Sequence, residues 1–134
     1  MIVPHNNALG IVVEQIQKGG IAVFKLPYAD NLVGNPETGI LHGGAITSLL
    51  DATCGAAVFA ALSELKPIAT LDLRIDYLRP ADAGKDVRAR ANCYKVTRNV
   101  AFVRAMAFHD DENDPIAAAA GTFMLGTKLG KVKP

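Results

Sequence analysis

The sequence predicts a two-layer α+β domain in which one long apolar helix packs against a twisted antiparallel sheet. Residues 39–63 carry a single formal charge, Asp51, and are apolar nearly all round, which is typical of a helix buried on most sides. Four β-rich segments follow this helix and are joined by short turns, so neighbouring strands are expected to be antiparallel. At 134 residues, the chain is expected to form a single domain over 1–134.

The N-terminal part of the chain predicts a hairpin, a loop and then the helix. Two β-rich runs within residues 10–27, GIVVEQIQ and IAVFKL, flank a Lys-Gly-Gly turn, and this pattern is a good hairpin signal. Residues 28–38 are rich in Asn, Gly and Pro and are predicted to be a loop. The helix is expected to run from about Gly43 to about Leu65, since the proline two residues later cannot continue it.

The C-terminal half predicts four strands in succession. In the segment LDLRIDY, apolar and charged residues alternate strictly, which indicates one buried and one solvated face. The predicted strands cover residues 71–77, 86–96, 100–108 and 116–126, separated by turns at 79–84, 97–99 and 109–115. The predicted element order is therefore β-β-α-β-β-β-β.

The composition of the chain argues against several classes of protein. Half of the residues are hydrophobic and the net charge is +1, so a disordered chain is not expected. Tryptophan is absent and aromatic residues are few, which leaves few stacking platforms for nucleic acid. Polar residues within 40–62 argue against a membrane span, and residues 1–10 lack a signal-peptide pattern, so a cytoplasmic protein without membrane contact is expected. Cys54 and Cys93 lack metal-like spacing and are expected to be small core residues.

The expected start of the helix combines features of a reactive site. Gly43 and Gly44 leave the backbone N–H groups of the helix N-terminus open to a carbonyl or an oxyanion, beside the positive end of the helix dipole. Asp51 follows nine residues after His42, and a lone carboxylate is costly to bury in an apolar helix. The pattern favours a site that holds an oxyanion near an acid–base or nucleophilic group. The alternative is a core helix with one strained Asp.

These features together resemble a known family. The element order, His42-Gly43-Gly44-Ala45 and the helical Asp51 are similar to the hotdog-fold acyl-CoA thioesterases, and to their PaaI-like (phenylacetic-acid-degradation) branch in particular. The resemblance extends from about Leu9 to Gly126 and includes an Asn-bearing loop, the strand end DLRIDYLRPA and the turn RNVAF.

The resemblance implies a role for each residue of the helix motif. Asp51 matches the catalytic carboxylate, and Gly43 matches the residue whose backbone N–H polarises the thioester carbonyl, with Gly44 beside it. His42 matches the motif histidine, which usually supports the site; a role as general base is the alternative. Whether Asp51 acts as a nucleophile or as a base stays open.

Further positions are implied outside the helix. Asn35 matches a loop Asn that helps to place substrate or water, and Thr70 falls where a Ser or Thr assists the water. Arg98 and Asn99 lie in the turn that often meets the nucleotide part of coenzyme A. Two departures are present, because the Asn35 loop is one residue longer than expected and Thr97 stands where Gly is frequent. Ordinary roles stay open for these residues, as turn, strand and hairpin-tip positions.

The sequence thus predicts hydrolysis of an acyl-CoA thioester, with coenzyme A as part of the substrate and with no cofactor or metal. The resemblance further implies a homodimer or a dimer-of-dimers homotetramer, with active sites between subunits. The alternatives are a hotdog hydroxyacyl-thioester dehydratase, which the glycines after the histidine disfavour, and a non-catalytic acyl-CoA binding protein. An acyl pocket is expected to be lined by four residues, Leu49, Leu50, Phe59 and Phe102.

Overall fold

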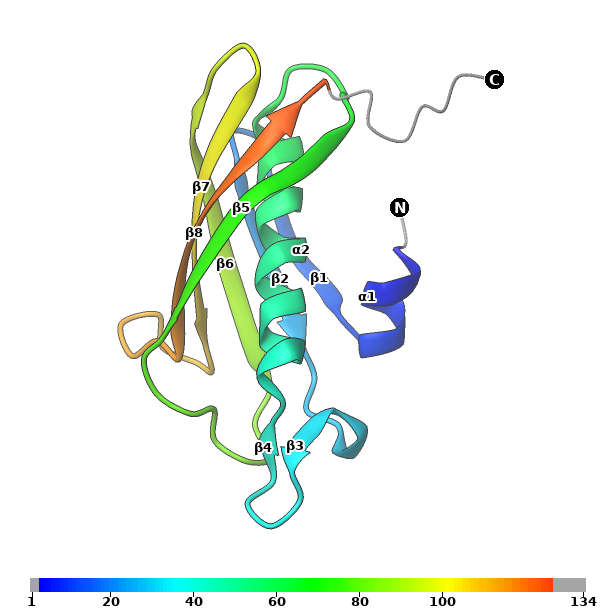
Figure 1. Cartoon of the computed structure of the whole chain (residues 1–134), viewed down its shortest axis with the longest axis vertical. Coiled ribbons are helices and arrows are strands. Elements are labelled where there is room, and N and C mark those ends of the chain that lie inside the picture. The colour runs from blue at the N-terminus through cyan, green and yellow to red at the C-terminus, as the bar shows by residue number, and fades with distance from the viewer. Residues whose placement is uncertain (1–2, 127–134) are drawn as a thin grey trace.

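A six-stranded antiparallel sheet wraps around one long helix, as the computed structural model shows for residues 3–126 (Figure 1). The predicted domain bounds of 1–134 extend beyond these described residues. The helices are α1 (Pro4–Leu9), the 3-10 helix η1 (Asp30–Leu32) and α2 (Gly43–Ala61). The strands are β1 (Val12–Gln17), β2 (Ile21–Leu26), β3 (Val33–Asn35), β4 (Ile40–Leu41), β5 (Ile68–Tyr77), β6 (Val87–Val96), β7 (Val100–Phe108) and β8 (Ala117–Leu125).

The strand order of the sheet is β1-β2-β6-β7-β8-β5, and β3 pairs with β4 in a small separate hairpin. This arrangement confirms the predicted hotdog architecture. The predicted β1–β2 hairpin is confirmed as well: Gly19 and Gly20 have φ angles of 105° and 110°, a conformation that residues with a side chain rarely adopt. Strands β1 and β5 form the two edges of the sheet.

The core lies between α2 and the inner face of the sheet. Along β6, the alternate residues Val87, Ala89, Ala91 and Cys93 face the helix and are buried. Small side chains on the inner face, together with the small residues of α2, allow the helix to approach the sheet closely. By length and composition α2 could cross a membrane, but eight of its residues are buried, mainly against β2, β6 and β7.

Three local features differ from the sequence-based expectations. Residues 4–9 form α1, a short helix with Pro4 at its first turn, where no helix was expected. Helix α2 ends at Ala61 rather than near Leu65, because Leu62 is already extended and Leu65, 86% exposed, finds nothing to pack against. The expected loop 28–38 contains η1 and β3.

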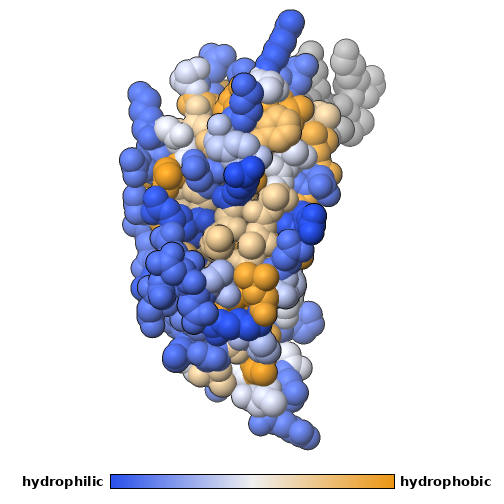
Figure 2. All heavy atoms as spheres, turned by 90° about the vertical axis from the view of Figure 1, so that its left-hand side faces the viewer, coloured by the Kyte–Doolittle hydropathy of each residue, from blue (hydrophilic) through white to orange (hydrophobic). Residues whose placement is uncertain are grey.

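The outer face of the sheet, turned away from α2, carries a band of small and apolar residues between polar borders (Figure 2). Strand β8 contributes Ala118, Ala120 and Met124 to this band, and β7 contributes Phe102 and Met106. The predicted alternation of inner and outer residues in the C-terminal strands is therefore confirmed. The outer positions of β7 and β8, however, are less polar than the charged outer positions of β5.

Candidate active site

The N-terminus of α2 is capped by the side chain of His42. The imidazole Nδ1 accepts a hydrogen bond from the backbone N–H of Gly44 at 2.8 Å, so the ring proton of the neutral side chain lies on Nε2. A Cβ at Gly44 would lie 2.9 Å from Nδ1, and therefore only glycine lets the imidazole fold back over the helix. Gly34 on β3 is needed for a similar reason, since its Cβ would lie 2.9 Å from the Cα of His42.

Gly43 is not required by packing. A Cβ at this position would have its nearest contact at 3.7 Å, with the hydroxyl of Tyr77, which is an ordinary van der Waals distance. Within residues 3–126, the N–H of Gly43 has no hydrogen-bond acceptor, whereas the N–H groups of Gly44 and Ala45 bond to His42. The helix start therefore presents one unpaired N–H in an open position, at the positive end of the helix dipole.

Asp51 lies on the face of α2 that the sheet leaves open. Its Oδ1 accepts a hydrogen bond of 3.0 Å from Oγ1 of Thr70 on β5. Asp51 is partly exposed and not buried, which differs from the sequence-based expectation, because β5 covers only one flank of the helix here. A carboxylate with one hydrogen-bond donor and access to solvent costs far less to desolvate than a buried one.

Asp51 and Gly43 are too far apart to act together within one chain. Eight residues separate them along α2, and at about 1.5 Å per residue this places their backbones roughly 12 Å apart. A thioester carbonyl held at the Gly43 N–H of one chain therefore lies beyond the reach of the same chain's Asp51.

Asn35 closes the turn between β3 and β4. Its side-chain Oδ1 accepts from the N–H of Glu37 at 3.0 Å, and its carbonyl accepts from the N–H of Gly39 at 2.8 Å. Asn35 is exposed and follows Gly34, against which His42 packs, so it lies at the same end of the molecule as the helix start.

Arg98 and Asn99 lie at the opposite end of the molecule. They form the exposed tip of the β6–β7 hairpin, at the end where α2 finishes (Figure 1). Thr97 holds this turn through its hydroxyl, which donates to the carbonyl of Val100 and accepts from its N–H. A single chain does not bring this tip near Gly43.

The four residues expected to line an acyl pocket do not lie together in the chain, so this prediction is wrong. Leu49 and Leu50 are fully buried in the core, whereas Phe59 is 39% exposed on the helix. Phe102 lies on the outer face of the sheet, where its ring packs near that of Tyr94. Helical periodicity alone did not separate the inner from the outer side of α2, because the helix is apolar nearly all round.

Sequence reasoning missed Tyr77 and Thr47. The Tyr77 hydroxyl donates to the carbonyl of Gly43 at 2.9 Å and lies 2.7 Å from Oγ1 of Thr47. One signal was available, because Tyr77 continues the apolar positions of the alternating segment LDLRIDY and is therefore predicted to face the helix.

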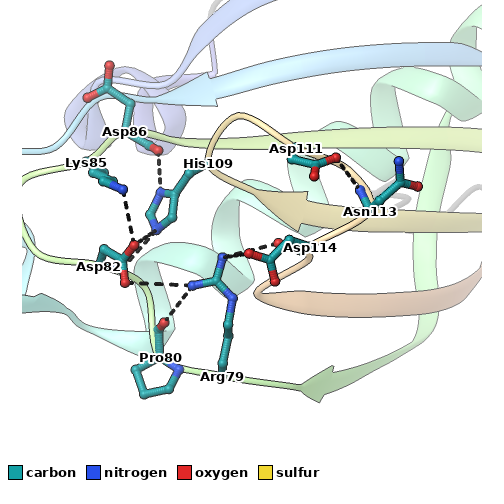
Figure 3. Close-up of polar contacts among 9 residues, drawn as sticks. All are labelled: Arg79, Pro80, Asp82, Lys85, Asp86, His109, Asp111, Asn113 and Asp114. Carbon is teal, nitrogen blue, oxygen red and sulfur yellow. Dashed lines mark hydrogen bonds and ion pairs between the residues drawn. The ribbon is translucent and has the colours of Figure 1, made fainter.

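A second polar cluster fastens the β5–β6 loop to the β7–β8 turn (Figure 3). Nδ1 of the buried His109 donates to the carbonyl of Asp86 at 2.8 Å, and Nε2 accepts from the N–H of Asp82 at 2.9 Å. Arg79 forms ion pairs with Asp82 at 3.7 Å and with Asp114 at 3.3 Å. The ring nitrogens of His109 and both Nη atoms of Arg79 are paired, while Nε of Arg79 is buried without a hydrogen-bond partner in the described residues. A network in which most groups pair with one another is typical of a structural contact.

Neither cysteine is activated. Burial, followed by the nearby charge of Asp51, raises the pKa of Cys54 to about 12, and burial also raises the pKa of Cys93. Both are free thiols within the core, as expected. In the described part of the chain, no group of three or more His, Cys, Asp or Glu side chains is arranged to hold a metal ion.

Comparison with known proteins places this geometry in a family. A model of the thioesterase superfamily matches residues 38–116, a segment that includes the helix start, Asp51 and Thr70. The chain belongs to the thioesterase superfamily. The family assignment and the hotdog fold agree with the sequence-based prediction.

Individual members of the superfamily are similar to this chain over most of their length. The medium/long-chain acyl-CoA thioesterase YigI of Escherichia coli K12 is 34% identical over 92% of this chain and 86% of its own. A crystal structure from Pseudomonas aeruginosa is 47% identical, with a TM-score of 0.81 over 90% of this chain and 88% of that one. An Asn-to-Asp mutant of the phenylacetic acid degradation protein PaaI from Thermus thermophilus is 28% identical, with a TM-score of 0.78 over 91% of this chain and 98% of that one.

Proposed function

We propose that this protein hydrolyses acyl-CoA thioesters to a free acid and coenzyme A. The observation that carries the proposal is the unpaired N–H of Gly43 at an open helix N-terminus, in a superfamily of thioesterases. A fixed backbone donor at a helix start stabilises the oxyanion that forms when a thioester carbonyl is attacked, and needs no reorganisation to do so.

Asp51 supplies the second requirement of the reaction. As a base, its carboxylate takes a proton from water while the water oxygen attacks the carbonyl carbon; the C–S bond then breaks and the coenzyme A thiolate leaves. As a nucleophile, the carboxylate attacks the carbonyl itself; the C–S bond breaks, the coenzyme A thiolate leaves and a mixed anhydride forms, which water then hydrolyses to the free acid and the regenerated carboxylate. Thr70 serves either route, because its hydroxyl holds one carboxylate oxygen at 3.0 Å and fixes the orientation of the other.

The roles of the neighbouring residues follow from their contacts. His42 caps the helix through Nδ1, which argues against a role as general base and leaves its Nε2–H as a donor. Gly44 makes room for this imidazole, and Asn35 shapes the turn beside it and has an amide available to place water or substrate. The exposed Arg98 and Asn99 are suited to bind the phosphate-bearing part of coenzyme A.

The site needs a second copy of the chain. Asp51 and Gly43 lie roughly 12 Å apart along α2, so a complete site takes Asp51 from one subunit and the helix start from its partner. The surface we propose for this contact is the edge strand β5, which pairs only with β8 among the described strands. It carries the exposed Leu71 and is followed directly by the exposed Leu78. The assembly is a homodimer or a dimer-of-dimers homotetramer.

We propose medium- or long-chain acyl-CoA as the substrate class, which the similarity to YigI supports. Water and the substrate supply every atom of the products, so the proposed reaction uses no cofactor. The proposed location is the cytoplasm.

The test is release of free thiol from a panel of acyl-CoAs, from arylacetyl to long-chain, by the wild type and by Asp51→Asn. Hydrolysis that collapses in the variant, while circular dichroism and oligomer size are unchanged, supports the proposal, and the panel identifies the acyl class. Binding without thiol release in either protein contradicts it. Loss of water from a hydroxyacyl-CoA under the same conditions would instead indicate the dehydratase alternative.

A further inference from the structure

Tyr77, the last residue of β5, links this strand to the first turn of α2. Its hydroxyl has one hydrogen, which it donates to the carbonyl of Gly43 at 2.9 Å. In the 2.7 Å contact between Tyr77 and Thr47, the Thr47 hydroxyl must therefore be the donor. The two side chains form a short directed chain of hydrogen bonds that ends on the backbone of the helix start.

This chain continues through the peptide group to His42. The carbonyl of Gly43 and the N–H of Gly44 belong to the same peptide unit, and that N–H donates to Nδ1 of His42 at 2.8 Å. A hydrogen bond to the carbonyl polarises the peptide and strengthens its N–H as a donor. The hydroxyl of Tyr77 thus favours the imidazole tautomer that accepts at Nδ1 and carries its proton on the exposed Nε2.

Strand β5 holds the carboxylate as well as the helix start. Thr70, which bonds to Asp51, and Tyr77, which bonds to Gly43, both face α2. Seven positions separate the two residues, so in a regular strand they would point to opposite faces of the sheet. A β-bulge between Thr70 and Asp72 adds one residue, Leu71, and brings both side chains to the inner face.

We propose that Tyr77 is a positioning residue of the proposed thioesterase site: its hydroxyl orients the Gly43–Gly44 peptide and, through the Gly44 N–H, the His42 imidazole, so that the His42 Nε2–H is presented to the substrate carbonyl beside the Gly43 N–H. The bulge at Leu71 allows the same strand to hold Asp51 through Thr70. The proposal rests on the proposed function, and it adds a second donor, the imidazole Nε2–H, to the carbonyl-binding end.

The test is Tyr77→Phe, which removes the hydroxyl and keeps the ring. Tyr94→Phe is the matched control, because Tyr94 is also half exposed but lies on the outer face of the sheet, 4.4 Å from the guanidinium of Arg104. We expect Tyr77→Phe to lower kcat about tenfold with KM changed less than about twofold, since the lost orientation acts mainly in the transition state. Tyr94→Phe is expected to leave both constants unchanged.

A spectroscopic measurement distinguishes a role of Tyr77 in positioning His42 from a role in protein stability alone. Imidazole 15N NMR is expected to show His42 as the tautomer with the proton on Nε2 in the wild type and in Tyr94→Phe, and as a mixture in Tyr77→Phe. If Tyr77→Phe does not fold, Thr47→Val removes the other hydroxyl of the chain, and Thr47→Ser, which restores it, is expected to return kcat to the wild-type value.

Two outcomes overturn separate claims. If Asp51→Asn is inactive while Tyr77→Phe keeps its kcat and its His42 spectrum, the positioning role is wrong and the proposed hydrolysis stands. If the wild type releases no thiol from any acyl-CoA, the proposed hydrolysis fails. The His42 spectrum of Tyr77→Phe then decides by itself whether the hydrogen-bond chain exists, and an unchanged spectrum overturns it.

Discussion

Substitution by alanine is expected to have different effects at Gly43 and at Gly44, the two glycines of the helix start. In Gly43→Ala, the new Cβ lies 3.7 Å from the Tyr77 hydroxyl and fits without movement. Alanine is favoured over glycine in a helix by at most about 1 kcal/mol, so the free energy of unfolding is expected to stay constant or rise slightly. The same Cβ occupies the open space beside the N–H that we assign to the substrate carbonyl.

The expected effect of Gly43→Ala on hydrolysis is large. A displacement of the carbonyl by about 1 Å costs about 10²-fold in rate, the lower end of the effect of removing an oxyanion donor. In Gly44→Ala, the Cβ would lie 2.9 Å from Nδ1 of His42 and must push the imidazole away. The loss of that cap costs about 1 kcal/mol, which the helix preference of alanine offsets in part.

Urea denaturation followed by circular dichroism measures the free energy of unfolding, and thiol release from an acyl-CoA measures activity. Gly43→Ala is expected to retain its stability and to lose about 10²-fold in kcat/KM, a loss that stability cannot explain. Wild-type activity in a folded Gly43→Ala would refute the assignment of this N–H to the carbonyl. A strongly destabilised Gly43→Ala would refute the description of this position as open space.

Other expectations concern the core, the thiols and the bulge. Leu50→Ala, at a fully buried site, is expected to lower the free energy of unfolding by about 2–5 kcal/mol in urea, against less than about 0.5 kcal/mol for the exposed Leu65→Ala. With its pKa raised to about 12, Cys54 has roughly one thiolate in 10⁴ molecules at pH 8, so a disulfide reagent should label it only after unfolding; rapid labelling of the native protein would contradict its burial. Deletion of Leu71 removes the bulge and should turn Thr70 away from the helix, so that thiol release falls as far as in Thr70→Val; wild-type activity after the deletion would argue against a role for the bulge.

Much of the architecture was predictable because its signals are local and strong. Strict alternation in LDLRIDY predicted β5, and the Gly-Gly turn predicted the first hairpin. The long apolar segment predicted α2 and its packing against a sheet. Its C-terminal end was missed by four residues, since helix propensity continues past Ala61 while the packing partners do not.

The details that shape the candidate site were harder to predict. The bulge at Leu71 is a property of the pairing between β5 and β8, which no local pattern in the chain records. The partial exposure of Asp51 depends on which face of α2 the sheet covers, and a helix that is apolar nearly all round does not specify that face. The motif did predict an open helix start at Gly43, whereas the need for Gly44 and Gly34 to accommodate His42 required the three-dimensional structure.

The central claim, hydrolysis at sites shared between two chains, is tested most directly by mixing two inactive variants. Asp51→Asn and Gly43→Ala chains are unfolded together in equal amounts, refolded, and assayed for thiol release, with mixed assemblies confirmed by native mass spectrometry. Random pairing places an intact Asp51 opposite an intact Gly43 in about a quarter of the sites, so about a quarter of wild-type activity is expected. Mixed assemblies that remain as inactive as the two parents would contradict the shared site.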